Sequence, residues 1–364
     1  MVYKTLLKLH RWLGIITGPI VFVIAVTGAL YAFQEEFQDL TQPYRFVQIK
    51  KQAFLKPSVL YAKAISLHPS KKVHAILYDE PGRAAKVIFY KYDAYYRIVF
   101  LNPYTGKILA DTNQEAGFFS WILRGHFNLW LPEWLGKPIV AWVTLAFALV
   151  VITGLLVWLS RGNWSPKKWR FKRTKNLKRR NYDLHTLIGF YTSAFALVFA
   201  TTGLVWGFVW FEEAYYKVAS FGDTFQAYSE PVLSAKISDP NQMVVIDQLF
   251  ELKKRQIKTG QWLEFHIPEQ QNGSIAFNVN LDRHTYGQID YHYYDPLQNR
   301  ELSVDHHWGR IKEAGFAQRL QRSNYDIHVG SILGIWGKCL AFLASLCIAA
   351  MPITGYLIWR NRKK

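Results

Sequence analysis

Four long stretches with almost no charged residues constrain the fold of this chain more than any other feature. They are Leu13–Phe33, Pro138–Leu159, Leu184–Phe211 and Ile332–Trp359, and Lys338 is the one charged residue within them. Each reaches the roughly 20 residues that an α-helix needs to cross the hydrocarbon core of a bilayer. We therefore predict four transmembrane helices. Four buried helices of a soluble protein are the alternative, but they do not explain the cations that cluster beside the stretches.

The distribution of lysine and arginine predicts the orientation of the helices. Cations precede the first stretch and follow the last, and ten more lie without any acid in residues 161–180. Because cytoplasmic segments are enriched in these residues, we expect both termini and this segment in the cytoplasm. Residues 34–137 and 212–331 are then expected outside it. The net charge of +18 comes almost entirely from these flanks, so it indicates topology and not nucleic-acid binding.

The chain also repeats itself, which predicts a tandem duplication. The equivalent positions are His10 and His185, His126 and His328, Thr27-Gly28 and Thr202-Gly203, and Thr153-Gly154 and Thr354-Gly355. The loops repeat as well: a helical segment at 57–67 or 241–258 precedes three strand-like runs rich in β-branched and aromatic residues. Because each copy has two spans, both copies are expected to share one orientation.

Four of the eleven histidines occupy equivalent positions and are the candidate ligands. His10 and His185 lie at one predicted membrane face, and His126 and His328 lie at the other. Two imidazoles that face each other from neighbouring helices suit the two axial positions of a haem iron. Since the faces are about 30 Å apart, one haem cannot use all four residues, and the sequence predicts two haems. A divalent metal between paired histidines is an alternative, although closed zinc sites normally have four ligands.

Other residues have weaker signals. His306 and His307 precede His328 and are interpreted as a substrate contact or an alternative ligand. Cys339 and Cys347 form no CxxCH motif, so covalent haem attachment is not expected. Several glycines near the histidines are consistent either with a flat cofactor or with close helix packing, and the Thr-Gly pairs are attributed to packing.

The chain resembles the PepSY-associated transmembrane helix family of bacterial inner-membrane proteins over essentially its full length. The residues that carry the resemblance are Leu9–Gly14, Asp183–His185 with Gly189, Asp326–Gly330 with Gly334 and Gly337, Ile353–Trp359, and the turn Asn102–Gly106. Around His126 the sequence Arg124-Gly125-His126-Phe127-Asn128 departs from the Leu-His-Arg pattern of the family.

The resemblance implies a haem-dependent reductase of ferric siderophores or other Fe(III) chelates. Two non-covalent b-type haems are implied, one held by His10 and His185 near the cytoplasm and one held by His126 and His328 near the periplasm. The electron donor is expected to be a quinol or a cytoplasmic reductase, because no GxGxxG turn within a βαβ unit is visible. The alternatives are a membrane-anchored PepSY module that binds peptides or regulates a protease, a transporter of siderophore or iron, and an electron carrier for another acceptor.

The predicted fold is an integral-membrane bundle of four helices with two periplasmic α+β PepSY-like domains, arranged as a tandem repeat. Its predicted segments are transmembrane helix 1 at 1–36, the first PepSY-like domain at 37–115, the approach to helix 2 and that helix at 116–160, a basic cytoplasmic loop at 161–181, helix 3 at 182–213, the second PepSY-like domain at 214–315, and helix 4 with a basic tail at 316–364.

Overall fold

The computed structural model describes residues 2–160, 169–170, 174–233, 235–236, 239–268, 270 and 272–362. Residues 161–168 and 171–173 of the predicted basic loop, and Lys363 and Lys364 of the basic tail, lie outside the described residues. The chain divides into two compact units. We call residues 1–34, 118–215 and 325–364 the helical unit, and residues 35–117 and 216–324 the sheet unit.

Long helices dominate the helical unit. They are α1 (Val2–Tyr31), α5 (Glu133–Leu159), α6 (Leu177–Gly207) and α11 (Gly334–Arg362). Among the described residues, four helical segments are long and apolar enough to cross a membrane, and they coincide with these helices. This confirms the prediction of four spans and identifies a membrane protein. The shorter helices of the chain are α2 (Gln34–Thr41), α3 (Pro57–Ile65), α4 (Phe118–Asn128), α7 (Val209–Ala219), α8 (Asp239–Lys253), α9 (Phe316–Arg322) and α10 (Asn324–Val329), and the 3-10 turns are η1 (Pro43–Arg45), η3 (Lys254–Gln256) and η4 (Ser331–Leu333).

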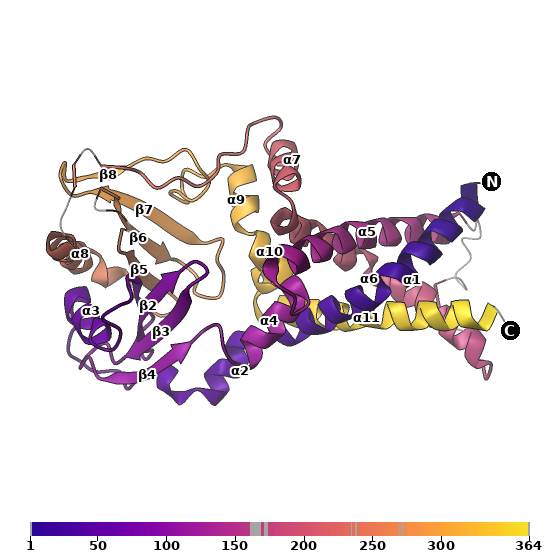
Figure 1. Ribbon diagram of the computed structural model, residues 1–364, viewed down its shortest axis with the longest axis horizontal. Coiled ribbons are helices and arrows are strands. Elements are labelled where there is room, and N and C mark those ends of the chain that lie inside the picture. Colours follow the sequence, from indigo (N-terminus) through magenta and orange to yellow (C-terminus); the bar gives the residue numbers. More distant parts are fainter. Residues whose placement is uncertain are drawn as a thin grey trace. The chain divides into compact units, whose positions relative to one another are not determined.

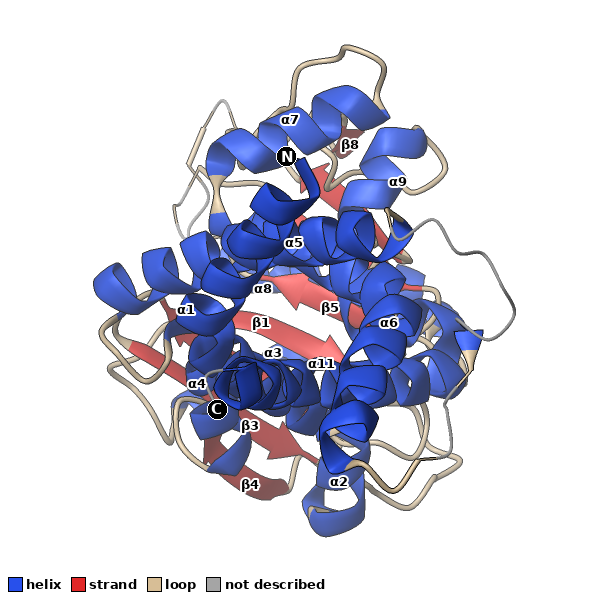
Figure 2. Ribbon diagram, turned by 90° about the vertical axis from the view of Figure 1, so that its right-hand side faces the viewer, coloured by secondary structure: helices blue, strands red, loops and turns tan. Residues whose placement is uncertain are grey.

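The four long helices form a ring in which each packs mainly against two neighbours (Figure 2). Helix α1 packs against α5 and α11, and α6 packs against the same two helices. Ala25 of α1, Ala196 of α6 and Ala349 of α11 are buried together in its core. Such small side chains let helices approach closely in a membrane. Helices α1 and α6 therefore face each other across the ring.

The sheet unit is built on one antiparallel sheet with the order β4-β3-β2-β1-β5-β6-β7-β8 in the described part of the chain. The strands are β1 (Val73–Tyr78), β2 (Ala85–Lys91), β3 (Tyr95–Leu101), β4 (Ile108–Asn113), β5 (Trp262–His266), β6 (Ile275–Asn280), β7 (Ile289–Asp295) and β8 (Arg300–Leu302). The order is symmetric about the seam between β1 and β5. The two α+β domains expected from the sequence are thus halves of one unit, and their pairing covers two strand edges that would otherwise be open.

The predicted strands correspond to β1–β3 and β5–β7, and the sequence analysis missed β4 and β8. Strand β4 is mostly exposed or half-buried, and β8 has only three residues. Neither has the alternation of apolar and polar residues that marks a half-buried strand. Both lie at the ends of the sheet, where a strand needs fewer apolar contacts.

Alternate residues of the strands bury one face of the sheet against α3 and α8, which lie on the same side of it (Figure 1). Ile76, Phe89, Phe265 and Phe277 belong to this core. The two helices are joined to each other because the backbone N–H and the hydroxyl of Ser58 donate to the Asp247 carboxylate at 2.9 and 2.6 Å. We call the face away from α3 and α8 the open face.

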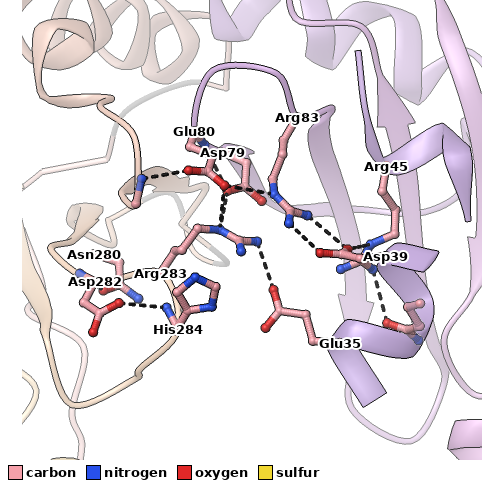
Figure 3. Close-up of polar contacts among 12 residues, drawn as sticks. Glu35, Asp39, Arg45, Asp79, Glu80, Arg83, Asn280, Asp282, Arg283 and His284 are labelled. Carbon is pink, nitrogen blue, oxygen red and sulfur yellow. Dashed lines mark hydrogen bonds and ion pairs between the residues drawn. The ribbon is translucent and has the colours of Figure 1, made fainter. Parts of the chain in front are cut away.

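A buried ion-pair network lies at one end of the seam (Figure 3). Arg283, in the connection between β6 and β7, donates to Asp79 at 3.3 Å and to Glu35 at 2.9 Å. Lys86 lies 3.3 Å from the other oxygen of Asp79. Although burial favours the protonated acid, the charges of Lys86 and Arg283 hold the pKa of Asp79 below its ordinary value. The network therefore links the two halves of the sheet through an ionised, buried carboxylate.

Candidate functional site

The four predicted histidines lie in two pairs within the helical unit. His10 on α1 and His185 on α6 have ring centroids 6.2 Å apart, with their planes at 71°. His126 on α4 and His328 on α10 have centroids 6.1 Å apart, with their planes at 69°. We call His10 and His185 the first pair and His126 and His328 the second pair. Each pair combines one residue from each predicted repeat.

The separation within each pair matches that of two imidazoles on opposite sides of one metal ion. In such a site each ligand nitrogen lies about 2 Å from the metal and about 1.15 Å from the centre of its own ring. The two ring centroids are then about 6.3 Å apart. The observed values of 6.2 and 6.1 Å are close to this distance. If the two imidazoles of a pair only packed against each other, the two pairs would not need to share the same centroid separation.

Hydrogen bonds to backbone carbonyls fix the tautomers of His10 and His126. Nδ1 of His10 lies 2.9 Å from the carbonyl oxygen of Val150, and Nδ1 of His126 lies 2.9 Å from that of Ile24. A carbonyl oxygen only accepts hydrogen bonds, so in each neutral ring Nδ1 carries the proton. Nε2 is therefore left with its lone pair.

His185 and His328 reach the same tautomer through threonine hydroxyls. Nδ1 of His185 lies 2.9 Å from Oγ1 of Thr354, and Nδ1 of His328 lies 2.7 Å from Oγ1 of Thr202. Each hydroxyl already donates its proton to a carbonyl of its own helix, at 3.0 and 2.6 Å. It must then accept from Nδ1, so Nε2 again carries a lone pair. Metal-binding histidines commonly donate their second N–H to an oxygen in this way.

A glycine lies beside each of the four rings, and three of these glycines leave room that a Cβ would fill. A Cβ added to Gly28 or Gly154 would lie 2.9 Å from Cε1 of His126 or His10, and one added to Gly355 would lie 3.2 Å from that of His185. At Gly203 the corresponding distance to His328 is 3.7 Å, an ordinary contact. Each of these glycines follows a threonine within 3.5 Å of the same histidine. We call the pairs Thr27-Gly28, Thr153-Gly154, Thr202-Gly203 and Thr354-Gly355 the histidine sockets.

The sequence alone favours helix packing as the role of these Thr-Gly pairs, whereas in the structure they contact the candidate ligands. The sequence does contain a signal for the sockets, because each of the four spans has a Thr-Gly pair that follows one of the four candidate histidines. The sequence did not reveal which histidine each socket holds. Helix α1 carries His10 at one end and the socket for His126 at the other, and α6 repeats this arrangement with His185 and His328. Because 18 residues separate His10 from Gly28, the two levels lie about 27 Å apart along the helix.

A cavity of about 590 Å³ contains the first pair. Its wall is largely apolar and includes Gly14, Gly18 and Gly189, and Arg11 is the cation of its lining. Nε of Arg11 is buried and has no hydrogen-bond partner. The volume is within the range of about 300–1,000 Å³ that is usual for cofactor sites. A flat apolar macrocycle with acidic substituents fits a wall of this kind, because Arg11 can pair with a carboxylate.

Residues 7–362 match the sequence model of the PepSY-associated TM region. The chain belongs to this family. The match confirms the family expected from the sequence, and it covers both the helical unit and the sheet unit. No curated protein has a matching sequence.

The donor set in this PepSY-associated TM protein favours a porphyrin over a bare metal ion. Among the described residues, no three or more His, Cys, Asp or Glu side chains come together in a group that could hold a metal. Each pair therefore offers two nitrogen ligands, whereas a closed zinc site normally has four. The four nitrogens of a porphyrin would complete the coordination of an iron between the two imidazoles. The residues of both pairs thus fit haem.

His306 and His307 belong to the sheet unit. His306 has both ring nitrogens engaged, because Nε2 lies 3.2 Å from the carbonyl oxygen of Ser229 and Nδ1 accepts from the backbone N–H of Trp308. His307 is buried, and its Nδ1 has no hydrogen-bond partner. Burial, together with the charges of His306 and Arg322, lowers the pKa of His307 to about 4, so this ring is neutral at pH 7. A ligand or substrate role for these two residues stays a prediction.

Proposed function

We propose that this protein transfers electrons across the bacterial inner membrane by means of two non-covalent b-type haems and reduces a ferric siderophore or another Fe(III) chelate on the periplasmic side. The observation that carries the proposal is the arrangement of the two histidine pairs. In each pair, both rings keep a lone pair on Nε2, and the centroid spacing suits two ligands of one iron. Haem bound in this way supplies reversible one-electron chemistry.

The residues around the pairs are suited to holding the rings and tuning their basicity. The Nδ1–H bonds to Val150, Ile24, Thr354 and Thr202 orient the imidazoles and increase their electron donation. The glycines at 28, 154 and 355 leave out the Cβ that would crowd the neighbouring ring. The apolar wall around the first pair would exclude water from a bound haem, and Arg11 would offset the negative charge of one of its carboxylates.

The proposed direction of transfer rests on the sequence. The basic flanks predict that the first pair lies near the cytoplasm and the second pair near the periplasm. A quinol or a cytoplasmic reductase is the proposed donor at the first pair. The family match supports a membrane protein of this kind, and the Fe(III) chelate as acceptor is proposed from the resemblance of the sequence to siderophore reductases.

Reconstitution into liposomes tests this function. With a membrane-impermeant reductant trapped on the cytoplasmic side and an Fe(III) chelate with a chromogenic Fe(II) chelator on the other, we expect Fe(II) to form outside the vesicles. The double variant His10→Ala/His185→Ala, which removes the first pair, should reduce the rate to that of protein-free vesicles. Equal rates for both proteins would reject transmembrane electron transfer. Accumulation of iron inside the vesicles would instead indicate the transporter.

The sockets give a matched test of the second pair. Gly28→Ala places a Cβ 2.9 Å from the His126 ring, whereas Gly203→Ala places one 3.7 Å from the His328 ring. Both changes add one methyl group to a membrane helix. We expect Gly28→Ala to displace His126 and lower the midpoint potential or the occupancy of one haem, and Gly203→Ala to leave both unchanged. Redox titration followed at the haem absorption bands measures the difference, and identical titrations would show that the sockets do not position the rings.

A further inference from the structure

The short helix that carries His126 ends in a strained corner. Shortly after the end of α4, Leu129 and Trp130 have φ angles of 57° and 59°. This left-handed conformation is unfavourable for any residue with a Cβ. The backbone N–H groups of these two residues donate to the carbonyl oxygens of Gly125 and Arg124, each at 3.3 Å. Residues other than glycine keep such a conformation only where their surroundings hold it, and it is common beside functional sites.

The second repeat turns an equivalent corner with a glycine. Two residues after its histidine stands Gly330, whose φ of 81° is freely accessible to a residue without a Cβ. The packing of the two corners is otherwise alike. In α5, a Cβ added to Gly136 would overlap the carbonyl oxygen of Asn128. In α11, one added to Gly337 would overlap the carbonyl oxygen of Gly330 in the same way. The first repeat therefore has an unfavourable backbone at a corner that a glycine can form, and this backbone includes Trp130.

The left-handed turn brings the indole of Trp130 back over α4. A Cβ added to Gly125 would lie 2.7 Å from Cε2 and 2.9 Å from Cη2 of this indole, so the ring fills the space of a side chain at 125. The indole also stacks on Trp121, with ring centroids 4.6 Å apart and planes at 30°. Its Nε1 donates to the carbonyl oxygen of Trp121 at 2.8 Å. In the second repeat the residue before the histidine is Ile327, which has a side chain of its own.

The contact of the indole with α4 lies next to the candidate ligand. Trp121 and Gly125 are one turn apart on one face of the helix. His126 and Ile122 share the adjacent face, and Ile122 is only 2% exposed, so that face points into the helical unit. Helix α4 has 11 residues, and a helix of this length is marginal by itself. The hydrogen bond from Nδ1 of His126 to Ile24 can orient the ring only while the last turn of α4 is in place.

We propose that Trp130 is a positioning residue for His126, and that its indole holds the last turn of α4 so that the His126 ring stays opposite the His328 ring. This inference rests on the proposed function, because it assigns a supporting residue to the second haem site. His10 and His185 of the first pair belong instead to α1 and α6, which have 30 and 31 residues.

Transfer of haem from the full-length protein to excess apomyoglobin measures how firmly each site holds its haem. In Trp130→Ala we expect one of the two haems to leave about tenfold faster and the other to leave at the unmodified rate. The electron paramagnetic resonance signal of a low-spin ferric haem depends on the angle between its imidazole planes, which is 69° in the second pair. One of the two signals should therefore shift. The matched control Trp134→Ala removes an indole that is 78% exposed and should change neither result.

Gly125 gives a second test of the same contact. Gly125→Ala places a Cβ against the indole, so it should accelerate the loss of the same haem. In the double variant Gly125→Ala/Trp130→Ala the new methyl group meets no indole. The double variant should then lose haem no faster than Trp130→Ala alone, whereas two independent effects would multiply.

Three results would overturn the positioning role. One is an unchanged rate and an unchanged signal in Trp130→Ala while the unmodified protein binds two haems, a result that leaves the electron-transfer proposal standing. Another is equal acceleration at both sites, which would indicate general destabilisation. The third is multiplication of the two effects in the double variant, which would show that Trp130 does not act through Gly125. An unmodified protein without haem would reject the proposed function itself, and this role with it.

Discussion

His328→Ala is expected to release about half of the bound haem and leave the other half with an unchanged bis-histidine spectrum. His328 and His126 form the second pair, 6.1 Å between ring centroids, and removal of one ring leaves the iron with a single protein ligand. The first pair has its own two histidines and its own cavity, so it should keep its haem. Pyridine-haemochrome quantitation against protein mass, with electron paramagnetic resonance of the remaining haem, measures both effects.

His185→Ala gives the complementary result, with loss of the other half of the haem. The two levels lie about 27 Å apart along α1 and α6 and share no ligand, so the two losses should be additive in the double variant. His284→Ala is the control, because His284 is an exposed histidine of the sheet unit and should keep the full haem content. A complete loss of haem in either single variant would mean that the pairs do not act as separate sites.

Arg283→Ala is expected to destabilise the sheet unit by about 3–5 kcal/mol, because it leaves the buried carboxylate of Asp79 with one of its two cations. The side chains of Arg283 and Asp79 are 5% and 2% exposed, and they lie 3.3 Å apart. Removal of the guanidinium also removes one ion pair each from Glu35 and Glu80. Thermal unfolding of the full-length protein, followed by near-ultraviolet circular dichroism, should show the transition of this unit about 10 °C lower.

Arg300→Ala is the control for this change. Arg300 is an exposed arginine on the short edge strand β8, and its loss should move the transition by less than about 2 °C. Haem content should be the same in both variants, because both histidine pairs belong to the helical unit. Equal transitions for Arg283→Ala and Arg300→Ala would show that the network does not stabilise the sheet.

The sequence predicts the parts of this fold that have a long or periodic signal. Uncharged stretches of about 20 residues identify the membrane helices, and the repeat identifies which histidines are equivalent. The pairing of His10 with His185 and of His126 with His328 follows from that equivalence. The reciprocal use of the sockets does not, because it depends on which helices are neighbours in the ring. A Thr-Gly pair on α1 serves a histidine about 98 residues later in the chain.

Features that depend on contacts across the chain also escaped sequence reasoning. The seam between β1 and β5 joins strands from the two halves. No residue of either strand indicates in the sequence which strand it pairs with. The role of Arg283 is a similar case, since its partners Glu35 and Asp79 lie some 200 residues away or more. The sequence around Arg283 does not predict that its side chain is only 5% exposed. The contact between the rings of His74 and His266 likewise arises only when both halves pair in the observed register.

The haem content and spectrum of the unmodified protein test the proposed electron transfer most directly. The protein is produced with an ample supply of haem, purified in mild detergent, and measured in oxidised and dithionite-reduced form with pyridine-haemochrome quantitation. We expect about two b-type haems per chain with the low-spin spectrum of two imidazole ligands on each iron. A protein that folds and contains no haem, or whose haem is five-coordinate and high-spin, would contradict it and favour the membrane-anchored binding module.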